Sequence, residues 1–427
     1  MSKATRVLIL GGGRGTRLWP LTDDDVRPKP CVYVGGPKRL LEYIFDIMAR
    51  ADLYKPYVAV QHMETNITRA FRDGSDFVYD IDDEKTPLEI TYTRSPPDKQ
   101  FRGTADALRK SRVYLADNVV VANRETGEES KVDPQTYLTN KRTLRFKSFV
   151  ENFDNVVVCN GDILTNFDIS YLLHLHRERG ARATIAAYKM EDISRIPGQL
   201  GTMLLDAKGN LAAIDEKPRT VEDVKSDIIN PGIYVFDRSV LSWLDTHDDI
   251  SDFASHMFPE MLRQGFEIFA PVMHGYWNDL GTIENYRATN LHLIDGIKGV
   301  DTRSHIRRGQ EASRVLGDFH HSMIASGCLI ESGSSISNSV LSNDITVNPG
   351  VMLEDCIVNS GCEIGADCKA AIIDSDVIIE HGARLGEKVV IGKGTHVKAG
   401  ALVHPGVKIG PGQMISGEVK EDIGMNE

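Results

Sequence analysis

The chain has 427 residues, of which 41% are hydrophobic and 26% are charged, and its formal net charge is −12 at pH 7. This length favours two domains over a single hydrophobic core. The negative charge argues against an extended nucleic-acid surface, which needs basic patches, and no apolar run is long enough to span a bilayer. We therefore expect a globular cytoplasmic protein without a readable signal peptide.

The first two thirds of the chain alternate short apolar strands with helical patterns. Predicted strands cover residues 6–10, 57–61, 155–160, 183–188 and 232–236, and predicted helices cover residues 40–51 and 169–179. Such alternation is typical of an α/β fold, a Rossmann-like and mostly parallel sheet flanked by helices. Residues 120–149 are polar and strand-like, and their pattern indicates no function.

After about residue 324 the periodicity changes to six residues. The regular apolar positions are Ile373, Ile379, Leu385, Ile391, Val397, Val403, Ile409 and Ile415, and a less regular set comprises Ile330, Ile336, Ile345, Val351 and Ile357. A period of six fits neither an α-helix nor a hairpin, but it fits one side of a triangular parallel β-helix. We therefore predict a catalytic domain over residues 1–296, a linker over 297–322 and a hexapeptide-repeat coil over 323–427.

A glycine-rich segment follows the first predicted strand, with the sequence Leu10-Gly11-Gly12-Gly13-Arg14-Gly15-Thr16-Arg17-Leu18. Glycines let backbone N–H groups approach phosphate oxygens closely. The segment lacks the GK[ST] ending of a P-loop, and Thr16 occupies the place of the third glycine in a dinucleotide motif. A tight strand–helix turn is the alternative interpretation. The nearby cations Arg17, Arg27 and Lys29 favour a triphosphate site.

An acidic residue, Asp162, follows the predicted strand 155–160. The carboxyl end of a parallel strand is where such sheets place ligands. A carboxylate near polyphosphates adds only repulsion unless it holds a cation, so we interpret Asp162 as a Mg²⁺ ligand. An aspartate in an ordinary turn is the alternative.

Three further segments have unremarkable interpretations when each is read alone. Residues 101–107 contain Gly-Thr at a helix start, where Thr104 suits an N-cap. Residues 215–218, Asp-Glu-Lys-Pro, are typical of a solvated strand end. Residues 276–282, Tyr-Trp-Asn-Asp-Leu-Gly-Thr, read as an aromatic packing segment.

Taken together, these motifs resemble the sugar-nucleotide pyrophosphorylases, also called sugar-1-phosphate nucleotidyltransferases. The resemblance rests on G-G-x-G-T-R-L at residues 12–18, R-x-K-P at 27–30 and the pair Gly35-Gly36. It covers nearly the whole chain, because members join an α/β nucleotidyltransferase domain to a left-handed β-helix. It implies that an NTP and a sugar 1-phosphate react by one in-line displacement, with Mg²⁺ as cofactor, to give an NDP-sugar and pyrophosphate.

The resemblance also implies a role for each matching residue. Arg17 would grip the leaving pyrophosphate, Lys29 would stabilise phosphate charge, and Asp162 and Asp279 would hold the metal. The residues implied to bind the nucleotide are Leu10, Gly11, Gly12, Gly13, Gly15, Thr16, Gln61, Gly103, Thr104 and Asp106. The residues implied to bind the sugar phosphate are Gly201, Glu216, Lys217, Asn230 and Gly232.

The motifs point to two substrate pairs. Residues 103–106 and 251–253 resemble the ADP-glucose pyrophosphorylases, which implies ATP, glucose 1-phosphate and a role in glycogen biosynthesis. Residues 27–30 and 160–165 resemble the mannose-1-phosphate guanylyltransferases, which implies GDP-mannose synthesis. We favour ADP-glucose synthesis.

Two hypotheses of other classes remain open. A non-catalytic regulatory subunit of such an enzyme typically loses Arg17, Lys29 or a metal aspartate, all of which are present here. An acyltransferase built on the coil would use a histidine such as His381, His396 or His404. No acyl-carrier or CoA signature accompanies these histidines.

The flat faces of the coil predict a homo-oligomer, most simply a tetramer. We expect the coil to serve assembly or regulation, not the chemical step. The resemblance implies that phosphorylated effectors bind at the domain junction, with Lys38, Arg39, Arg307 and Arg308 as candidate contacts, and a solvated linker is the alternative.

The six cysteines form no CxxC pair and no zinc spacing, so we expect buried free thiols. They are Cys31, Cys159, Cys328, Cys356, Cys362 and Cys368.

Overall fold

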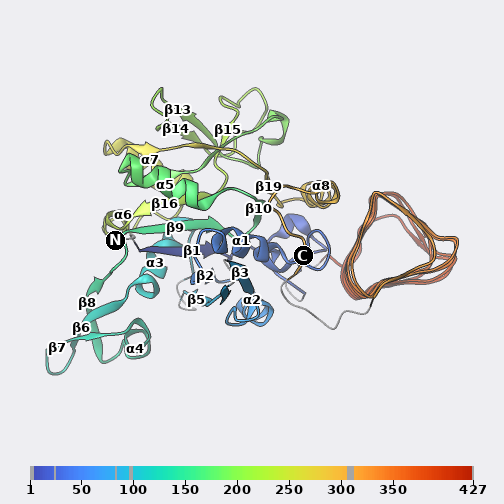
Figure 1. Ribbon diagram of the computed structural model, residues 1–427, viewed down its shortest axis with the longest axis horizontal. Helices are drawn as coiled ribbons and strands as arrows, with labels where there is room; N and C mark the ends of the chain where they lie inside the picture. Colours follow the sequence, from blue (N-terminus) through green and yellow to red (C-terminus); the bar gives the residue numbers. More distant parts are fainter. Residues whose placement is uncertain (1–3, 24–25, 82–83, 96–99, 305–311, 426–427) are drawn as a thin grey trace.

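The computed structural model describes residues 4–23, 26–81, 84–95, 100–304 and 312–425. It consists of an α/β domain and a C-terminal coil that lie side by side (Figure 1). The central sheet of the α/β domain has the strand order β17-β11-β16-β9-β1-β2-β5. Its strands are β1 (Thr5–Leu10), β2 (Pro56–Val60), β5 (Thr91–Arg94), β9 (Asn155–Asn160), β11 (Ala183–Ile185), β16 (Ile233–Asp237) and β17 (Ile268–Phe269). β16 runs antiparallel to both β9 and β11, and the other pairs are parallel.

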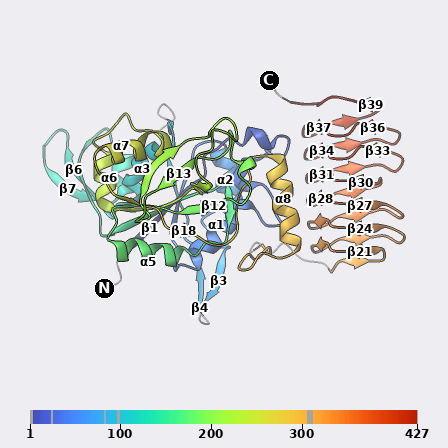
Figure 2. The same ribbon diagram turned by 90° about the horizontal axis from the view of Figure 1, so that it is seen from above.

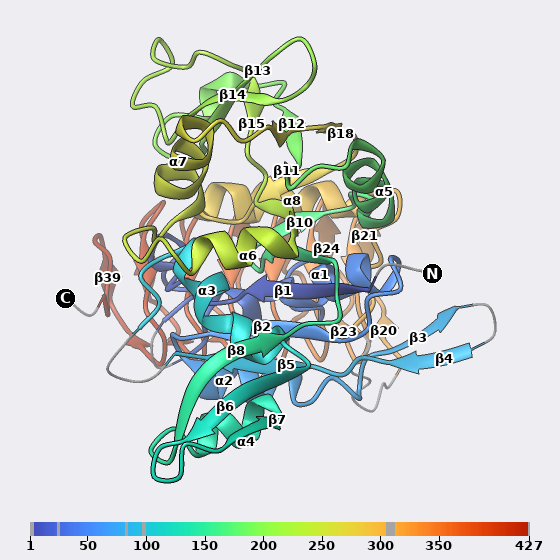
Figure 3. The same ribbon diagram turned by 90° about the vertical axis from the view of Figure 1, so that its left-hand side faces the viewer.

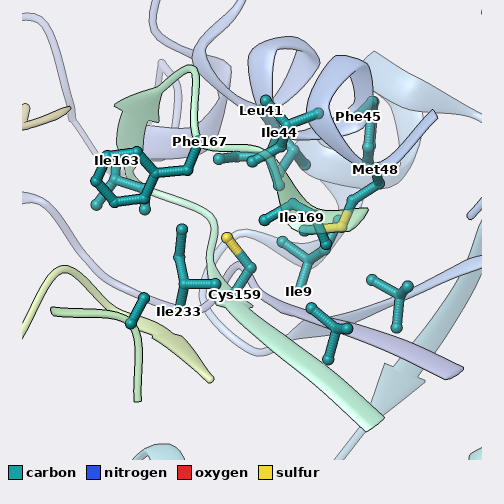
Figure 4. Packing of buried hydrophobic residues seen from close by; sticks show 14 of the residues in the cluster. Ile9, Leu41, Ile44, Phe45, Met48, Cys159, Ile163, Phe167, Ile169 and Ile233 are labelled. Carbon is teal, nitrogen blue, oxygen red and sulfur yellow. The ribbon is translucent and has the colours of Figure 1, made fainter. Parts of the chain in front are cut away.

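Alternate residues of the strands feed two apolar layers, one on each face of this sheet. Val7 and Ile9 pack with α1 (Leu40–Ala49), α2 (Glu64–Phe71) and α5 (Ile169–Arg179), and Figure 4 shows part of this layer around Ile9. The opposite layer contains Leu8 with residues of the other helices. These helices are α3 (Thr104–Leu115), α6 (Arg238–Leu244) and α7 (Phe258–Arg263). The helices therefore flank the sheet as the sequence predicts.

Most predicted elements are confirmed, with small shifts of their ends. The strand at 155–160 and the helix at 169–179 have the predicted bounds, whereas α1 ends at Ala49, before residue 51. The predicted strand 183–188 divides into β11 and β12 (Ala187–Lys189), which belong to different sheets. This division lets one segment connect the central sheet to a second lobe.

The second lobe has sheets of its own. Its main sheet has the order β14-β13-β15-β12-β18, and a two-stranded sheet joins β10 (Ile163–Thr165) to β19 (Trp277–Asp279). The remaining strands of the main sheet are β13 (Thr202–Leu205), β14 (Leu211–Asp215), β15 (Ile228–Ile229) and β18 (Val272–Met273).

Two excursions leave the α/β domain (Figure 3). The polar region 120–149 belongs to a three-stranded sheet of order β7-β6-β8 with a short helix. Its elements are β6 (Asn118–Asn123), β7 (Glu129–Val132), α4 (Pro134–Thr139) and β8 (Leu144–Val150). A hairpin of β3 (Val78–Ile81) and β4 (Glu84–Pro87) extends separately.

The C-terminal region is a parallel β-helix whose coils stack along one axis (Figure 2). One face contains β20 (Arg314–Val315), β23 (Leu329–Ile330), β26 (Thr346–Val347), β29 (Glu363–Ile364), β32 (Ile378–Ile379), β35 (His396–Val397) and β38 (Met414–Ile415). A second contains β22 (Met323–Ile324), β25 (Val340–Leu341), β28 (Ile357–Val358), β31 (Ile372–Ile373), β34 (Val390–Ile391) and β37 (Lys408–Ile409). The third contains β21 (Asp318–His320), β24 (Ser335–Ser337), β27 (Met352–Glu354), β30 (Cys368–Lys369), β33 (Arg384–Leu385), β36 (Leu402–Val403) and β39 (Glu418–Val419).

The coil begins earlier than predicted. β20 pairs with β23 and β21 pairs with β24, so the first coil starts at Arg314, within the predicted linker 297–322. The sequence signal fails there because the first coil lacks the regular apolar hexad. The later six-residue period is confirmed, since each of the predicted apolar positions between Ile373 and Ile415 lies in a strand of the coil.

The coil packs on the α/β domain through its second face. α8 (Ile283–Ile294) lies along this face (Figure 2), and an apolar cluster spans the two domains. α3 and α8 have 12 residues each, and no helix in the described part of the chain is long and apolar enough to cross a membrane.

Candidate active site

The predicted site residues gather where β1, β9 and β19 end. The glycine-rich segment follows β1, and Asp162 follows the neighbouring parallel strand β9. Asp279 ends β19, which pairs antiparallel with β10 so that Ile163 lies opposite Asp279. This pairing brings together two aspartates that are far apart in the sequence.

Lys29 connects the two aspartates. Its Nζ donates hydrogen bonds to Asp162 Oδ2 over 3.0 Å and to Asp279 Oδ1 over 2.9 Å. Burial lowers the pKa of the Lys29 ammonium, but the charges of Asp162 and Asp279 outweigh burial and raise that pKa above its ordinary value. Lys29 is therefore a fixed positive charge at the centre of the site.

The two carboxylates fit a divalent cation. The side chains of Asp162 and Asp279 remain 37% and 17% exposed, so a ligand can approach their oxygens. Among the described residues, no cluster of three or more histidine, cysteine, aspartate or glutamate side chains could hold a metal. Mg²⁺ is often held by one or two carboxylates, with phosphate and water oxygens completing its shell. The pair therefore suits a metal that arrives with a phosphorylated substrate.

A cavity of about 290 Å³ lies on the glycine-loop side of Lys29. The predicted nucleotide residues that line it are Leu10, Gly11, Gly12, Gly13, Gln61, Gly103 and Thr104. Gly15 lies behind Lys29, since a Cβ on Gly15 would be 2.9 Å from Lys29 Cβ, and Thr16 opens the short 3-10 turn that carries Arg17. These two residues support the loop.

Asp106 differs from the prediction. Its side chain is 2% exposed and forms ion pairs with Arg102, Arg109 and Lys110, and it is not part of the cavity wall. An acid in the first turn of α3 is drawn to backbone and side-chain donors around that turn. Asp106 therefore stabilises α3 and does not face a nucleotide in this conformation.

A second cavity of about 240 Å³ adjoins the first. All the predicted sugar-phosphate residues line it together with Asp162 and Asp279; they are Gly201, Glu216, Lys217, Asn230 and Gly232. Arg17 also lines this cavity, and both cavities share Thr104, Asn160, Asp162 and Asp252. The two cavities are thus compartments of one site that meet at Asp162.

Close contacts explain two of the glycines in the second cavity. A Cβ on Gly201 would lie 2.5 Å from Glu216 Oε2, so the absence of a side chain lets that carboxylate sit against the strand. Gly232 has φ +82°, and a Cβ there would lie 2.4 Å from Asn160 Nδ2. Glycine at these positions sets the width of the cavity.

Asp252 lines both cavities, although no sequence motif assigns it a role. Its Oδ2 accepts a hydrogen bond from Thr104 Oγ1 over 3.0 Å, and its Oδ1 accepts from the backbone N–H groups of Ala254 and Ser255. It caps the helical segment that follows it, in the manner of an N-cap aspartate. The cap signal was readable in the sequence, but the approach to Thr104, 148 residues away, was not.

Three of the predicted basic contacts bind groups within the fold, and two of them are buried. Arg27, which we expected to meet a triphosphate, is buried against Asp374 of the coil, with Nη1 2.9 Å from Oδ1. Lys38 is fully buried and pairs with Asp46 and the Asp301 carbonyl. Arg39 donates from Nη1 to the Ala70 carbonyl over 2.8 Å. The coil encloses Arg27, whereas Lys38 and Arg39 lie over aromatic rings of the α/β domain.

Arg307 and Arg308 lie outside the described residues. A cavity of about 1310 Å³ is at the domain junction and is lined by residues such as Gly36, Tyr79, Arg303 and Asn343. Its wall contains none of Lys29, Asp162 and Asp279, so this cavity is separate from the candidate active site.

All six cysteines are free and buried, as predicted. Burial raises the pKa of the Cys31 thiol to about 12, against the opposing effect of Arg39. The Cys31 thiol is therefore protonated near neutral pH, although the residue lies two positions from Lys29.

The sequence matches two known family models and several curated proteins. Residues 6–124 and 138–296 match the family model described as Nucleotidyl transferase, and residues 307–393 match the one described as GlmU-like, C-terminal hexapeptide. The "Glucose-1-phosphate adenylyltransferase" of Fervidobacterium nodosum is 27% identical, over 93% of this chain and 98% of the relative. Proteins of the same name from Desulfitobacterium hafniense and Trichlorobacter lovleyi are 24% and 26% identical, over 94% and 90% of this chain and 97% and 92% of the relatives. The nucleotidyl transferase match spans more than half of the sequence, and the chain therefore belongs to the nucleotidyl transferase family.

Proposed function

We propose that this protein is a sugar-1-phosphate nucleotidyltransferase that joins ATP and glucose 1-phosphate to give ADP-glucose and pyrophosphate. The observation that carries the proposal is the meeting of Lys29, Asp162 and Asp279 where a glycine-lined cavity adjoins a cavity lined by Glu216 and Lys217. The names of the relatives support adenylyl transfer to glucose 1-phosphate for this chain. ADP-glucose is the class of product that a glycogen-synthesising pathway consumes.

In the proposed reaction a phosphate oxygen of the sugar 1-phosphate attacks the α-phosphorus of the NTP. The bond between the α-phosphorus and the bridging oxygen breaks, and its electron pair leaves with pyrophosphate, so no covalent enzyme intermediate forms. Arg17 and Lys29 contribute positive charge, and the glycine loop contributes backbone N–H groups. Mg²⁺ held by Asp162 and Asp279 would neutralise phosphate charge. The protein mainly positions the two substrates.

A substrate panel tests the proposal. The purified full-length chain is incubated with Mg²⁺, pyrophosphate and ADP-glucose, GDP-mannose, UDP-glucose or dTDP-glucose in turn, and sugar 1-phosphate release is measured. We expect the highest kcat/KM with ADP-glucose. Absence of sugar 1-phosphate release from every NDP-sugar would contradict the catalytic proposal. It would favour the alternative of a non-catalytic subunit.

Mannose-1-phosphate guanylyl transfer is the second candidate. It is favoured by Arg27-Pro28-Lys29-Pro30 and by Asn230-Pro231-Gly232 at the sugar cavity. A higher kcat/KM with GDP-mannose in the same panel would select it over ADP-glucose synthesis.

We also propose that the coil assembles the chain into a homotetramer, because its exposed faces are flat and repetitive. Light scattering on the intact protein tests this proposal, and a monomer would contradict it. We further propose that phosphorylated effectors act at the domain junction. Titration of sugar bisphosphates, orthophosphate and nucleotide monophosphates into the activity assay tests this proposal, and an unchanged rate would contradict it.

A further inference from the structure

A buried ion pair joins the segment that carries Lys29 to the β-helix. Arg27 Nη1 donates to Asp374 Oδ1 over 2.9 Å, and the two side chains are 9% and 0% exposed. The partners are 347 residues apart in the sequence. Burial lowers the pKa of the Arg27 guanidinium, but the Asp374 charge outweighs burial and raises that pKa above its ordinary value, so Arg27 stays charged.

The Asp374 end of the pair is fixed within the coil. Oδ1 of Asp374 also accepts from Asn359 Nδ2 over 3.0 Å and from the Ser375 backbone N–H over 2.7 Å. The Asp374 backbone N–H donates to the Ile391 carbonyl of the next coil over 2.8 Å. These hydrogen bonds therefore hold the Asp374 carboxylate in place on the coil.

The Arg27 end is fixed to the catalytic segment. The guanidinium lies over the Tyr33 ring, 5.2 Å from its centroid, and the Arg27 backbone exchanges hydrogen bonds with Asp23. Two residues further on, Lys29 begins a short 3-10 turn (Lys29–Cys31), and Pro28 and Pro30 flank Lys29. Proline fixes the backbone φ angle, so this stretch has few ways to bend. A constraint on Arg27 is thus passed to Lys29.

Adhesion between the domains does not require this pair. An apolar cluster already joins them, with Leu18, Leu21 and Val32 on one side and Ile372 and Val390 on the other. Two buried charges cost more to desolvate than apolar contacts of the same size, and their attraction depends on geometry. Apolar contacts therefore hold the interface together, and the ion pair adds a contact that depends on the relative orientation of Arg27 and Asp374.

We propose that Arg27 and Asp374 are positioning residues that hold the Lys29 ammonium between Asp162 and Asp279. The coil would then help to build the active site, beyond the assembly role expected from the sequence. This inference rests on the proposed nucleotidyl transfer, because the ammonium is positioned for that reaction.

The test compares Asp374→Asn with Arg287→Ala in the full-length protein. Arg287 is a matched control, because its guanidinium also crosses the domain interface, to the carbonyls of Asp355 and Ala370, without touching the Lys29 segment. For each variant we would measure kcat, the KM of both substrates, the midpoint of thermal unfolding, and hydrogen exchange of the peptide covering residues 26–34.

We expect Asp374→Asn to lower kcat by about 10- to 100-fold with both KM values changed by less than about threefold, because misplacing a charged group impairs the transition state more than binding. Exchange in residues 26–34 should rise. Arg287→Ala should lower the unfolding midpoint but keep kcat within about threefold of wild type. Equal losses of kcat in the two variants, or an unchanged kcat in folded Asp374→Asn, would overturn the proposal.

If Asp374→Asn does not fold, Arg27→Lys replaces it, because it keeps the charge but loses the planar donor. A folded Arg27→Lys protein with wild-type kcat would overturn the proposal, and a reduced kcat with faster exchange in residues 26–34 would support it. Should the wild-type protein transfer no nucleotide at all, the proposed function fails. The hydrogen-exchange comparison would still decide whether the pair holds the segment.

Discussion

Replacement of Lys29 by methionine keeps most of the side-chain length and removes the charge. In the structure the ammonium lies 3.0 Å from Asp162 and 2.9 Å from Asp279, where charge would develop on the transferring phosphate. Loss of one preorganised electrostatic group from such a site typically costs about 10²- to 10³-fold in kcat, or about 2.7–4 kcal/mol. We expect Lys29→Met to lower kcat by this amount.

The same substitution should strengthen metal binding. The Lys29 ammonium now shares the two carboxylates, and its removal leaves two like charges facing each other. Each unit charge pair at about 4 Å is worth roughly 4 kcal/mol at an effective dielectric constant of 20, less where solvent screens the carboxylates. The Mg²⁺ concentration for half-maximal activity should therefore fall while kcat falls.

Pyrophosphate release over a Mg²⁺ titration measures both quantities, with thermal unfolding as the check on folding. Lys55→Met is a suitable control, because it removes a lysine from an exposed pair with Glu89, outside the site. We expect this control to behave as wild type. A Lys29→Met protein with kcat within about threefold of wild type, or with a raised Mg²⁺ requirement, would refute the reasoning.

Three further predictions follow from the same site. Asp162→Asn should remove most activity together with its dependence on Mg²⁺, which the same titration measures. If both are retained, Asp162 is not the metal ligand. Gly201→Ala puts a methyl group 2.5 Å from Glu216 Oε2, so it should raise the KM of the sugar 1-phosphate by about tenfold and leave the NTP KM nearly unchanged, as initial rates would reveal. The Cys31 thiol, buried and with a pKa of about 12, should resist iodoacetamide at about pH 8 until the chain unfolds. Mass spectrometry measures the labelling, and alkylation of Cys31 in the native protein would contradict this prediction.

The coil shows what periodicity can and cannot predict. From Ile373 onward the six-residue period places the inward residues correctly, because the paired strands repeat in even steps of the coil. Earlier, the period slips. Val358 faces the coil core, whereas Ile357, the predicted inward residue, packs toward the α/β domain. Ile357 and Val358 are both apolar because the α/β domain covers this face of the coil. The sequence alone does not reveal that the face is covered.

The site shows a similar division between local and distant information. The glycine loop and the sugar-side residues could be predicted, since each motif places its own side chains at the end of one strand. Partners that come from distant segments could not. Asp106 and Lys38 carry charges that suggest ligands, yet each is neutralised within the fold. A sequence motif gives the chemistry of a side chain, and only the folded chain decides what that side chain faces.

This division bears on the coil itself. The apolar cluster at the domain junction takes Leu18 and Leu21 from the segment after the glycine loop and Val32 from the segment after Lys29. Arg17 and Lys29 of these segments line the two cavities of the candidate site, whereas the apolar side chains pack against the coil. Removal of the coil would expose these apolar side chains and leave the buried Arg27 charge without Asp374. A chain truncated after Gly299 should therefore lose more than the proposed means of assembly, because the surface on which the Lys29 segment packs would be gone as well.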